Sequence, residues 1–335
     1  KGCSNIKELH IGSVASWLGI TFSDFSSNPL CVASNAKLYV GSQEKQEITA
    51  ADFGSVTSIS QYAFYNCSNL ISVTIPEGVK GIGWYAFSKC SSLTSVTIPE
   101  GVKGIGGSAF KGCSNIKELH IGSVASWLGI TFSNLFSNPL YVASNAKLYV
   151  NNEELREITA EDYTDEVTKI SQYAFYNCRS LTSITIPERV NSIGWNAFYG
   201  CYNIKEVIVN DLGAWSMINF SNATDNPLSQ TFNSNSSSFT TCGAKLYVQK
   251  TNEDGTITKE LVTRITEQNL ATNTTKKIGN YAFYGYRYLT SVVLPSGFSV
   301  GTDAFRYCYA LGEVYNFTGT TVTAGSSSST LGYVA

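Results

Sequence analysis

Nine cysteines and two histidines are the side chains of this 335-residue chain best suited to nucleophilic or metal chemistry. The cysteines form no Cys-x-x-Cys pair, and no histidine cluster lies near them, so the spacing of a metal site is missing. His10 and His120 stand in the same Leu-His-Ile context and belong to no Ser/His/Asp set. The sequence therefore predicts no metal site, and the histidines are interpreted as solvated surface residues.

Acidic residues and glycines also lack a catalytic pattern. Glu77 and Glu100 each follow a proline at a predicted corner of the chain, and no pair of carboxylates like that of a glycosidase can be nominated. The Gly81-Ile82-Gly83 segment lacks the strand-to-helix context of a phosphate-binding loop. We therefore predict that the protein is not an enzyme and holds no cofactor.

The spacing of the cysteines indicates a repeat instead, since Cys67 and Cys90 are 23 residues apart. One repeat position is occupied by Cys3, Cys67, Cys90, Cys113, Cys178, Cys201 and Cys308. Tyr286 takes this place in another unit, which a disulfide partner would not permit, so we interpret these cysteines as small buried apolar residues. Cys31 and Cys242 lie outside the column in irregular segments, and their redox state is left open.

One repeat unit runs from Leu70 to Cys90 and contains too few apolar residues to enclose a core, so neighbouring copies must supply it. Within the unit, alternation places Val73 and Ile75 on the buried side of a strand that Pro76 ends. The Ala-Phe-x-x-Cys segment is too short for a free helix and is predicted to form about one helical turn. The phenylalanines of successive units should stack in a column.

The run from Leu93 to Cys113 resembles the BspA-type leucine-rich repeat, also called the Treponema pallidum-type repeat. The resemblance implies a leucine-rich repeat solenoid, a right-handed curved superhelix with a parallel β-sheet on the concave side and short helical turns elsewhere. Members of this family are typically secreted or surface-attached proteins of bacteria, and of some protozoan parasites, with roles in adhesion and binding. The strand motifs of this sequence predict about eleven coils.

A longer repetition lies over the 23-residue period. Residues 1–23 are identical to residues 111–133, which indicates a duplication. Each long copy carries an irregular insert, and the inserts lie near 11–45, 121–155 and 209–258. Ser13, Ser123 and Asp211 stand four residues before the first tryptophan of each insert and are predicted to N-cap a short helix.

We expect one solenoid domain over residues 1–318 and a C-terminal tail or linker over 319–335, since no linker interrupts the periodicity. The sequence begins inside a repeat without a recognisable signal peptide, so we expect a portion of a longer surface protein. The net charge of −2 and the 14% of charged residues favour neither nucleic acid nor direct membrane insertion. A monomer is expected.

Two surfaces are candidates for binding. The exposed side of the strands either contacts a partner or is a solvated Ser/Thr ladder that stabilises the sheet by itself. Its candidate residues are Ser72, Thr74, Ser95, Thr97, Glu118, His120, Ser183, Thr185 and Glu206. A band of Tyr and Trp beside the Ala-Phe turns either binds a ligand or shields the coil junctions. Its candidate residues are Trp84, Tyr85, Trp195 and Tyr199.

The predicted function is a non-catalytic adhesion or protein-binding module, extracellular or at the cell surface, that contacts host or neighbouring-cell proteins. A structural spacer that carries another domain is one alternative. A glycan-binding module is another, and it requires Trp84 or Trp195 to be exposed. The sequence identifies neither the ligand nor the binding face, the source organism or the mode of anchoring.

Overall fold

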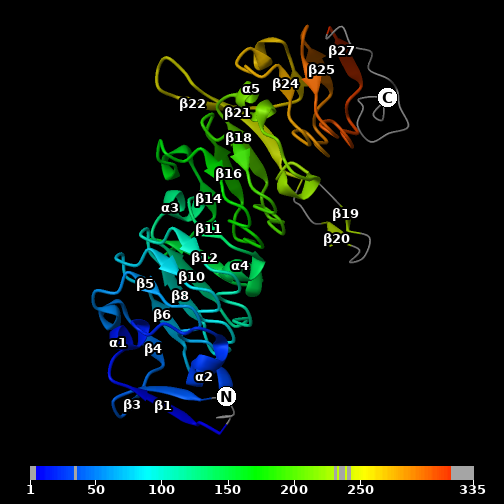
Figure 1. The fold of residues 1–335 in the computed structure, drawn as a ribbon. Coiled ribbons are helices and arrows are strands. Elements are labelled where there is room, and N and C mark those ends of the chain that lie inside the picture. The colour runs from blue at the N-terminus through cyan, green and yellow to red at the C-terminus, as the bar shows by residue number, and fades with distance from the viewer. Residues whose placement is uncertain (1–4, 34–35, 230–231, 234–237, 240–242, 318–335) are drawn as a thin grey trace. The chain divides into compact units, whose positions relative to one another are not determined.

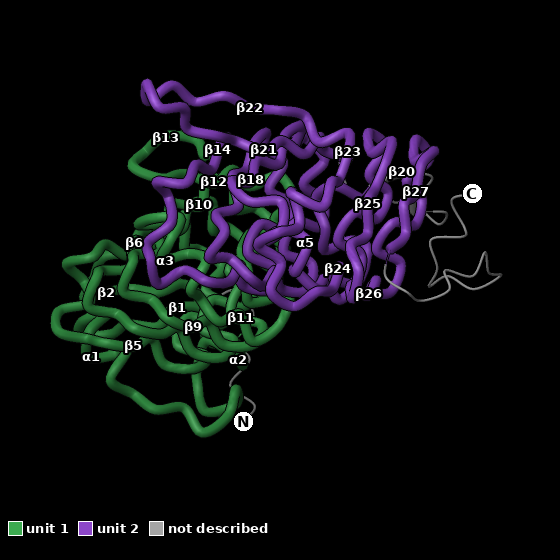
Figure 2. Tube along the Cα trace, turned by 90° about the horizontal axis from the view of Figure 1, so that it is seen from above, with its two compact units in different colours: residues 1–155 green, residues 156–335 purple. Residues whose placement is uncertain are grey.

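A computed structural model describes residues 5–33, 36–229, 232–233, 238–239 and 243–317 (Figure 1). The chain forms two compact units, residues 1–155 and 156–335 (Figure 2). Cys3, Cys242 and the tail 319–335 lie outside the described residues. The single domain over 1–318 stays a prediction.

Unit 1 is built around a six-stranded sheet whose strands follow the period of the repeat. Its order is β13-β12-β10-β8-β6-β4. The strands are β4 (Glu47–Ile48), β6 (Ser72–Thr74), β8 (Ser95–Ile98), β10 (Glu118–Ile121), β12 (Lys147–Val150) and β13 (Glu153–Glu154). All neighbours are parallel except the β12–β13 hairpin. Val73, Val96 and Leu119 are register partners and are buried, which confirms the predicted alternation.

A second sheet lies on another side of the unit 1 coils. It contains β5 (Ser58–Ile59), β7 (Gly81–Ile82), β9 (Gly104–Ile105) and β11 (Thr131–Phe132), all parallel. Three further strands form a separate sheet near the N-terminus: β1 (Glu8–Ile11), β2 (Lys37–Val40) and β3 (Gln43–Glu44). Val73 and Ile82, from the two sides of one coil, are both buried, so the core is assembled by stacking coils.

Unit 2 has the same kind of sheets. The largest contains β14 (Glu157–Ile158), β16 (Ser183–Ile186), β18 (Glu206–Val209), β21 (Lys245–Thr251) and β22 (Ile257–Leu261), in that order. A three-stranded sheet contains β23 (Arg264–Ile265), β25 (Ser291–Leu294) and β27 (Glu313–Asn316). Shorter pairs are β15 (Lys169–Ile170) with β17 (Ser192–Ile193), β24 (Lys277–Ile278) with β26 (Ser299–Val300), and β19 (Phe232–Asn233) with β20 (Ser238–Phe239). The mostly parallel strands confirm the leucine-rich repeat fold in both units.

The inserts contain the α-helices. α1 (Val14–Leu18), α3 (Val124–Leu128) and α5 (Leu212–Met217) begin after Ser13, Ser123 and Asp211, whose side chains each accept a backbone N–H bond, so the predicted N-caps are confirmed. α2 (Pro29–Val32) and α4 (Pro139–Val142) each follow an asparagine N-cap. The 3-10 helices are η1 (Phe25–Ser27), η2 (Ala50–Phe53), η3 (Leu135–Ser137), η4 (Ala160–Asp162), η5 (Ala223–Asp225) and η6 (Gln268–Leu270). No helix in the described part of the chain is long and apolar enough to cross a membrane.

The inserts are more regular than the sequence predicts. Each adds one strand, β2, β12 or β21, parallel to the repeat strand before it. The cause is the Lys-Leu-Tyr-Val motif, whose leucine is fully buried in every copy: Leu38, Leu148 and Leu246. The inserts therefore contain the predicted short helices and also a strand that extends the sheet.

Each of two inserts also docks on the Ala-Phe turn of a later coil. The indole Nε1 of Trp17 donates to the carbonyl oxygen of Ala63 at 2.8 Å, and the Asn28 amide donates to that of Tyr62 at 2.7 Å. In the third insert, Trp215 donates to the carbonyl oxygen of Ala282 at 3.1 Å. The tryptophan of the insert thus satisfies a backbone acceptor that the repeat leaves open.

The Ala-Phe segments form successive tight turns rather than the single helical turn expected from their length. Tyr62 and Asn66 flank one such turn with φ angles of 60° each, in the left-handed region. A residue with a left-handed φ interrupts right-handed helical geometry, so a right-handed helix cannot continue through the segment. The phenylalanines nevertheless stack as predicted, with ring centroids 5.4 Å apart for Phe64 and Phe87 and also for Phe87 and Phe110.

The cysteine column is buried and free of disulfides in the described residues, as the sequence predicts. Burial raises the pKa of the Cys67 thiol to about 12. The thiols have a further role, since each of four donates to the carbonyl oxygen of the phenylalanine one coil earlier. These bonds are Cys90 to Phe64 (3.1 Å), Cys113 to Phe87 (3.0 Å), Cys201 to Phe175 (2.9 Å) and Cys308 to Phe283 (3.0 Å). Tyr286, in the same column, also donates to a carbonyl oxygen, that of Val262 at 2.8 Å.

Candidate functional site

The outward side of the unit 1 strands carries the polar ladder that the sequence predicts. Across β6, β8 and β10 its rows are Ser72-Ser95-Glu118 and Thr74-Thr97-His120. All six side chains are at least partly exposed. The sequence prediction of an accessible strand face therefore holds for this unit.

His120 ends its row against Tyr149 of β12. The two rings stack with centroids 4.9 Å apart, and the imidazole Nε2 lies 3.4 Å from the Glu118 carboxylate. The imidazole is thus engaged with an aromatic ring and one carboxylate. No group of three or more His, Cys, Asp or Glu side chains among the described residues could hold a metal ion.

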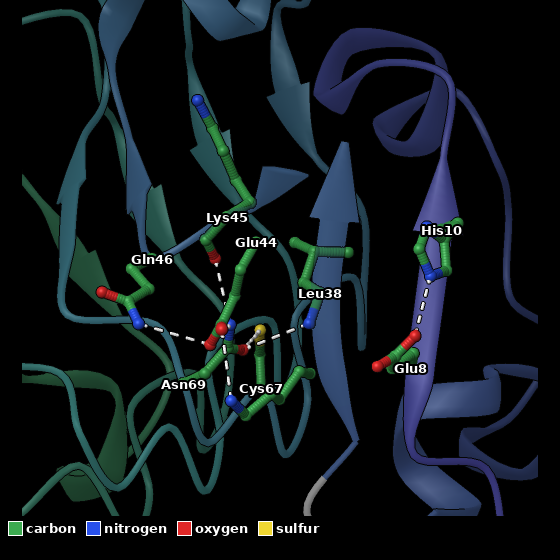
Figure 3. A network of polar contacts seen from close by, with 9 residues as sticks. Glu8, His10, Leu38, Glu44, Lys45, Gln46, Cys67 and Asn69 are labelled. Atoms are coloured by element: carbon green, nitrogen blue, oxygen red, sulfur yellow. Dashed lines mark hydrogen bonds and ion pairs between the residues drawn. The ribbon is translucent and has the colours of Figure 1, made fainter. Parts of the chain in front are cut away.

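His10 repeats this arrangement in the first copy. Its ring stacks on Tyr39 at 4.6 Å, and its Nε2 lies 3.1 Å from Glu8 (Figure 3). A hydrogen bond with the Gly41 carbonyl oxygen, and a second with Glu8, raises the pKa of His10. The duplicated histidines are exposed or half-exposed, in agreement with their interpretation as surface residues.

A polar network ties the β2–β3 hairpin to the next coil. The Asn69 amide donates to Glu44 at 3.2 Å and to the Lys45 carbonyl oxygen at 3.3 Å, and its oxygen accepts the N–H of Leu38 at 3.2 Å (Figure 3). Every one of these partners is a side chain or backbone group of the fold. The network is therefore structural, and it fixes the hairpin at the end of the insert.

The outward side of the unit 2 strands contains a groove with a volume of about 460 Å³. Residues of β14, β16 and β18 line one part of it, and residues of the β21–β22 hairpin line another. Its lining includes Glu157, Glu161, Ser183, Thr185, Glu206, Ile208, Gln249, Ile257 and Lys259. Ligand sites in proteins commonly enclose about 300–1,000 Å³, so the groove is large enough to take a ligand.

The hairpin beside this groove is longer than its counterparts. β21 and β22 have 7 and 5 residues, whereas β12 and β13 have 4 and 2. The hairpin extends past the ends of β16 and β18 (Figure 1). Gln249 and Lys259 are cross-strand partners, so their side chains share a face, and both line the groove. The extra length of the hairpin therefore supplies part of the groove.

Lys259 links the hairpin to the strand face. Its Nζ lies 2.7 Å from a carboxylate oxygen of Glu206 and 5.5 Å from the centroid of the Tyr247 ring. The two ion-pair side chains are 40% and 35% exposed, and exposed pairs of this kind contribute little net stability. The Lys259–Glu206 contact can therefore exchange for a contact with a ligand at small cost.

The remaining chemistry of the groove is acidic and partly apolar. Glu157 and Glu161 are exposed, and neither has an ion pair with any described residue. Ile257 is 62% exposed, an unusual position for a large aliphatic side chain. The groove thus offers two unpaired carboxylates and an apolar contact, which suits a cationic ligand with apolar groups.

Three of the predicted strand-face residues, Ser183, Thr185 and Glu206, come together in this groove. Thr185 was expected on the exposed side, but it is only 5% exposed. The expectation is wrong because larger side chains of β18, Glu206 and Ile208, stand beside it along the lining of the groove. The other predicted strand-face residues belong to unit 1.

The predicted aromatic residues lie apart from the lining of the groove. Trp84 and Trp195 are exposed, at 55% and 45%. Tyr85 stacks on Tyr62 with centroids 5.4 Å apart, and Tyr199 stacks on Tyr176 with centroids 4.8 Å apart. The tyrosines thus pair across neighbouring coils. Trp195 also contacts Tyr173, with centroids 5.6 Å apart, and both tryptophans keep part of their surface open.

Sequence reasoning missed the hairpin residues Gln249, Ile257 and Lys259, and the carboxylates of Glu157 and Glu161. The signal that points to the hairpin is the greater length of the third insert compared with the other two. The two glutamates give no signal of their own, because charged residues beside a strand are usually solvated.

The groove lies on repeated parallel strands with buried Leu, Val, Ile and Phe columns, and this pattern agrees with a family profile. The profile for the BspA type leucine-rich repeat region matches residues 36–146, 144–261 and 260–328, in 6 copies. The chain belongs to the BspA type leucine-rich repeat family. Repeats of this bacterial surface type serve as protein-binding modules, and BspA type repeats are typically non-catalytic.

Several solved structures are similar to this BspA type chain. A leucine-rich repeat protein from Bacteroides ovatus has 20% identity and a TM-score of 0.36, over 77% of this chain and 58% of that one. A leucine-rich cell surface protein from Faecalibacterium prausnitzii has 22% identity and a TM-score of 0.36, over 83% and 70% of the two chains. The T. pallidum leucine-rich repeat protein has 20% identity and a TM-score of 0.19, over 73% and 69%. No curated protein matches the chain.

Proposed function

We propose that this BspA type repeat protein is a non-catalytic binding module, secreted or held at the cell surface, whose unit 2 groove binds a segment of a host or neighbouring-cell protein. The observation that carries this proposal is the groove itself, whose lining brings together unpaired carboxylates and an exposed isoleucine. Binding to a protein on another cell makes the module an adhesin. The module acts as a monomer, with a single solenoid domain over 1–318.

The partner segment is cationic and partly apolar. A Lys or Arg side chain near Glu157 and Glu161 gains attraction that weakens with salt, as exposed charges do. An apolar side chain that covers Ile257 adds up to about 2 kcal/mol, because 62% of the isoleucine is exposed before binding. A second cation can replace Lys259 at Glu206 and release the hairpin.

An extended conformation of the partner fits the edge of the sheet. β22 is the last strand of the five-stranded sheet, so one of its edges is not paired within that sheet. Extended peptides bind such edges through backbone hydrogen bonds, and their alternate side chains reach pockets beside the edge. Ile257 and Lys259 project from β22 into the groove, where they meet those side chains.

A binding experiment with two model peptides tests the proposal. One labelled peptide alternates Lys and Leu, and the other alternates Glu and Leu; fluorescence anisotropy measures both against the whole chain. We expect only the Lys–Leu peptide to bind, with affinity that falls as salt rises.

The double variant Glu157→Gln/Glu161→Gln should weaken this binding about tenfold. Glu313→Gln, an exposed glutamate on β27, is the matched control and should leave it unchanged. Equal binding of both peptides, or no response to the double variant, would contradict the proposal.

Cross-linking identifies the natural partner and separates adhesion from a spacer role. A photoreactive amino acid replaces Ile257 in one sample and Tyr309, which is 73% exposed, in the other. Capture of a host or neighbouring-cell surface protein from position 257, and not from position 309, supports adhesion. Silence at both positions favours a structural spacer that carries another domain.

A further inference from the structure

Trp84 presents an open aromatic surface in unit 1, at the turn that follows β7. The chain contains five tryptophans, and those of the three inserts, Trp17, Trp127 and Trp215, are buried. Trp84 instead has 55% of its surface exposed. Leaving a large apolar ring in water forgoes the free energy that burial supplies, so the fold does not use most of this ring for its own stability.

A glycine of the next coil supports the ring. A Cβ atom at Gly107 would lie 3.0 Å from Cζ3 and 3.1 Å from Cε3 of Trp84. The six-membered ring of the indole therefore lies directly against the backbone of Gly107, in space that any other residue would fill. This contact fixes the ring and leaves the rest of its surface open.

A fixed amide donor lies beside the same ring. The Asn134 side-chain oxygen accepts the Ser108 N–H at 3.1 Å and the Ser137 hydroxyl at 3.3 Å. These two bonds set the orientation of the amide. Its Nδ2 would lie 2.9 Å from a Cβ at Gly107, the position that Trp84 also contacts, and Nδ2 has no hydrogen bond to any described residue. The Trp84 site therefore combines a supported aromatic surface with an oriented N–H donor.

A second amide occupies the position equivalent to Trp84 one coil earlier. Gln61 donates its Nε2 hydrogen to the Phe22 carbonyl oxygen at 2.6 Å, so its side chain is held as well. Its Oε1 accepts no hydrogen bond from any described residue. The coil before Trp84 thus carries a held acceptor, whereas the held Asn134 donor lies beside the ring itself.

We propose that the Trp84 site binds a neutral saccharide. A pyranose ring presents several C–H groups on one face, which pack on an indole, and it presents hydroxyl groups around its rim, which hydrogen-bond to amides. The Asn134 Nδ2 donates to one such hydroxyl, and the Gln61 Oε1 accepts from another. A protein hot spot would instead need a contiguous apolar patch, whereas this ring lies against a glycine and has the Asn134 amide beside it.

The Trp84 site is independent of the unit 2 groove, and its test uses different variants. The probes are hexasaccharides of β-1,4-glucose, α-1,4-glucose, β-1,3-glucose, β-1,4-galactose and β-1,4-N-acetylglucosamine. Tryptophan fluorescence and saturation-transfer NMR measure their binding to the whole chain. We expect saturable binding to at least one probe with a Kd on the order of 1 mM or tighter.

Trp84→Ala should weaken that binding at least about tenfold, and Asn134→Ala about threefold to tenfold. Trp195→Ala, which removes the exposed tryptophan of unit 2, is the matched control and should leave the affinity unchanged. Because Trp84 is mostly exposed, Trp84→Ala should keep the native circular dichroism spectrum, so a loss of binding is not a loss of folding. Absence of saturable binding to every probe by the folded chain would overturn the proposal. Equal affinity of Trp84→Ala and the unchanged chain for the bound saccharide would overturn it as well.

Discussion

Cys90 donates its thiol hydrogen to the backbone carbonyl oxygen of Phe64, 3.1 Å away and one coil earlier. The same carbonyl oxygen also accepts the N–H of Cys67 at 3.1 Å. The thiol therefore uses the second lone pair of an oxygen inside the core, where water cannot reach. The repeated cysteine links consecutive coils through a hydrogen bond as well as through packing.

Replacing Cys90 tests this link. Cys90→Ala removes both the sulfur and the donor and should lower the free energy of unfolding by about 1–3 kcal/mol. Cys90→Ser also removes the sulfur but keeps a donor, so it should lose less. Urea denaturation measures both, with Cys31→Ala, at a half-exposed position outside the column, as the control. An alanine variant as stable as the serine variant would show that packing alone explains the cysteine.

The phenylalanine column should be the most sensitive part of the core. Phe87 is fully buried and stacks on both Phe64 and Phe110. Phe87→Ala opens a cavity between three coils and should lower the free energy of unfolding by about 3–5 kcal/mol. Calorimetry measures the corresponding fall in melting temperature. An unchanged melting temperature would contradict the stacked column.

The left-handed backbone angles in the turns predict that Lys→Gly substitutions have opposite effects on stability at two positions. Lys89 has φ 63°, and Gly112 stands at the same repeat position with φ 84°. Lys89→Gly should raise the free energy of unfolding by up to about 1 kcal/mol, because glycine adopts this conformation without strain. Loss of the Lys89 contact over the Tyr65 ring offsets part of this gain. Lys80→Gly, at an exposed lysine without a positive φ, should lower stability instead. If urea titration shows equal losses of unfolding free energy for Lys89→Gly and Lys80→Gly, the strain argument is refuted.

Asp225 should make stability depend on pH. Burial raises its pKa to about 6, even though the N–H groups of Asn196 and Asn222 donate to its carboxylate at 2.6 and 3.0 Å. Because this folded-state pKa exceeds the ordinary value of 3.8, stability present at low pH is lost as pH rises through about 4 to 6. Relative to Asp225→Asn, the free energy of unfolding should fall on the order of 1–3 kcal/mol between pH 4 and 7. Urea titrations that run parallel for the two proteins would exclude this linkage.

The exposed ion pair of the groove should matter little for folding. Lys259→Ala removes the contact with Glu206 and should change the free energy of unfolding by less than about 1 kcal/mol, because both side chains are partly exposed. High salt should reduce even this difference. Glu206→Gln, which removes the other partner, should behave alike. A loss of several kcal/mol from either variant would mean that the hairpin is a structural brace.

The core of each coil could be predicted from sequence, whereas the geometry of its turns could not. The interval between Phe64 and Phe87 fixes which side chains are equivalent, and equivalent apolar residues must stack if neither can be buried alone. Cys90 directly follows Lys89, which has a left-handed φ, and no periodic pattern reports the sign of φ at a tyrosine, asparagine or lysine. Burial was therefore predictable, and the role of the thiol as a donor was not.

The groove was less predictable than the strand face that contains it. Alternation along β16 and β18 places Ser183 and Glu206 outward, as predicted from the sequence. The contact between Lys259 and Glu206 joins residues 53 positions apart, through a hairpin whose course the repeat does not determine. Thr185 shows the same limit of sequence-based prediction. Alternation gives the side of the sheet on which its side chain lies, but its low exposure depends on the sizes of the neighbouring side chains.

The unequal lengths of the β12–β13 and β21–β22 hairpins have an evolutionary consequence. Both hairpins begin with a Lys-Leu-Tyr-Val strand whose leucine is buried, so residues can be gained or lost at the tip while the sheet keeps its register. Evolution can therefore change what the protein recognises by lengthening one hairpin tip, without changing the core residues that all copies share.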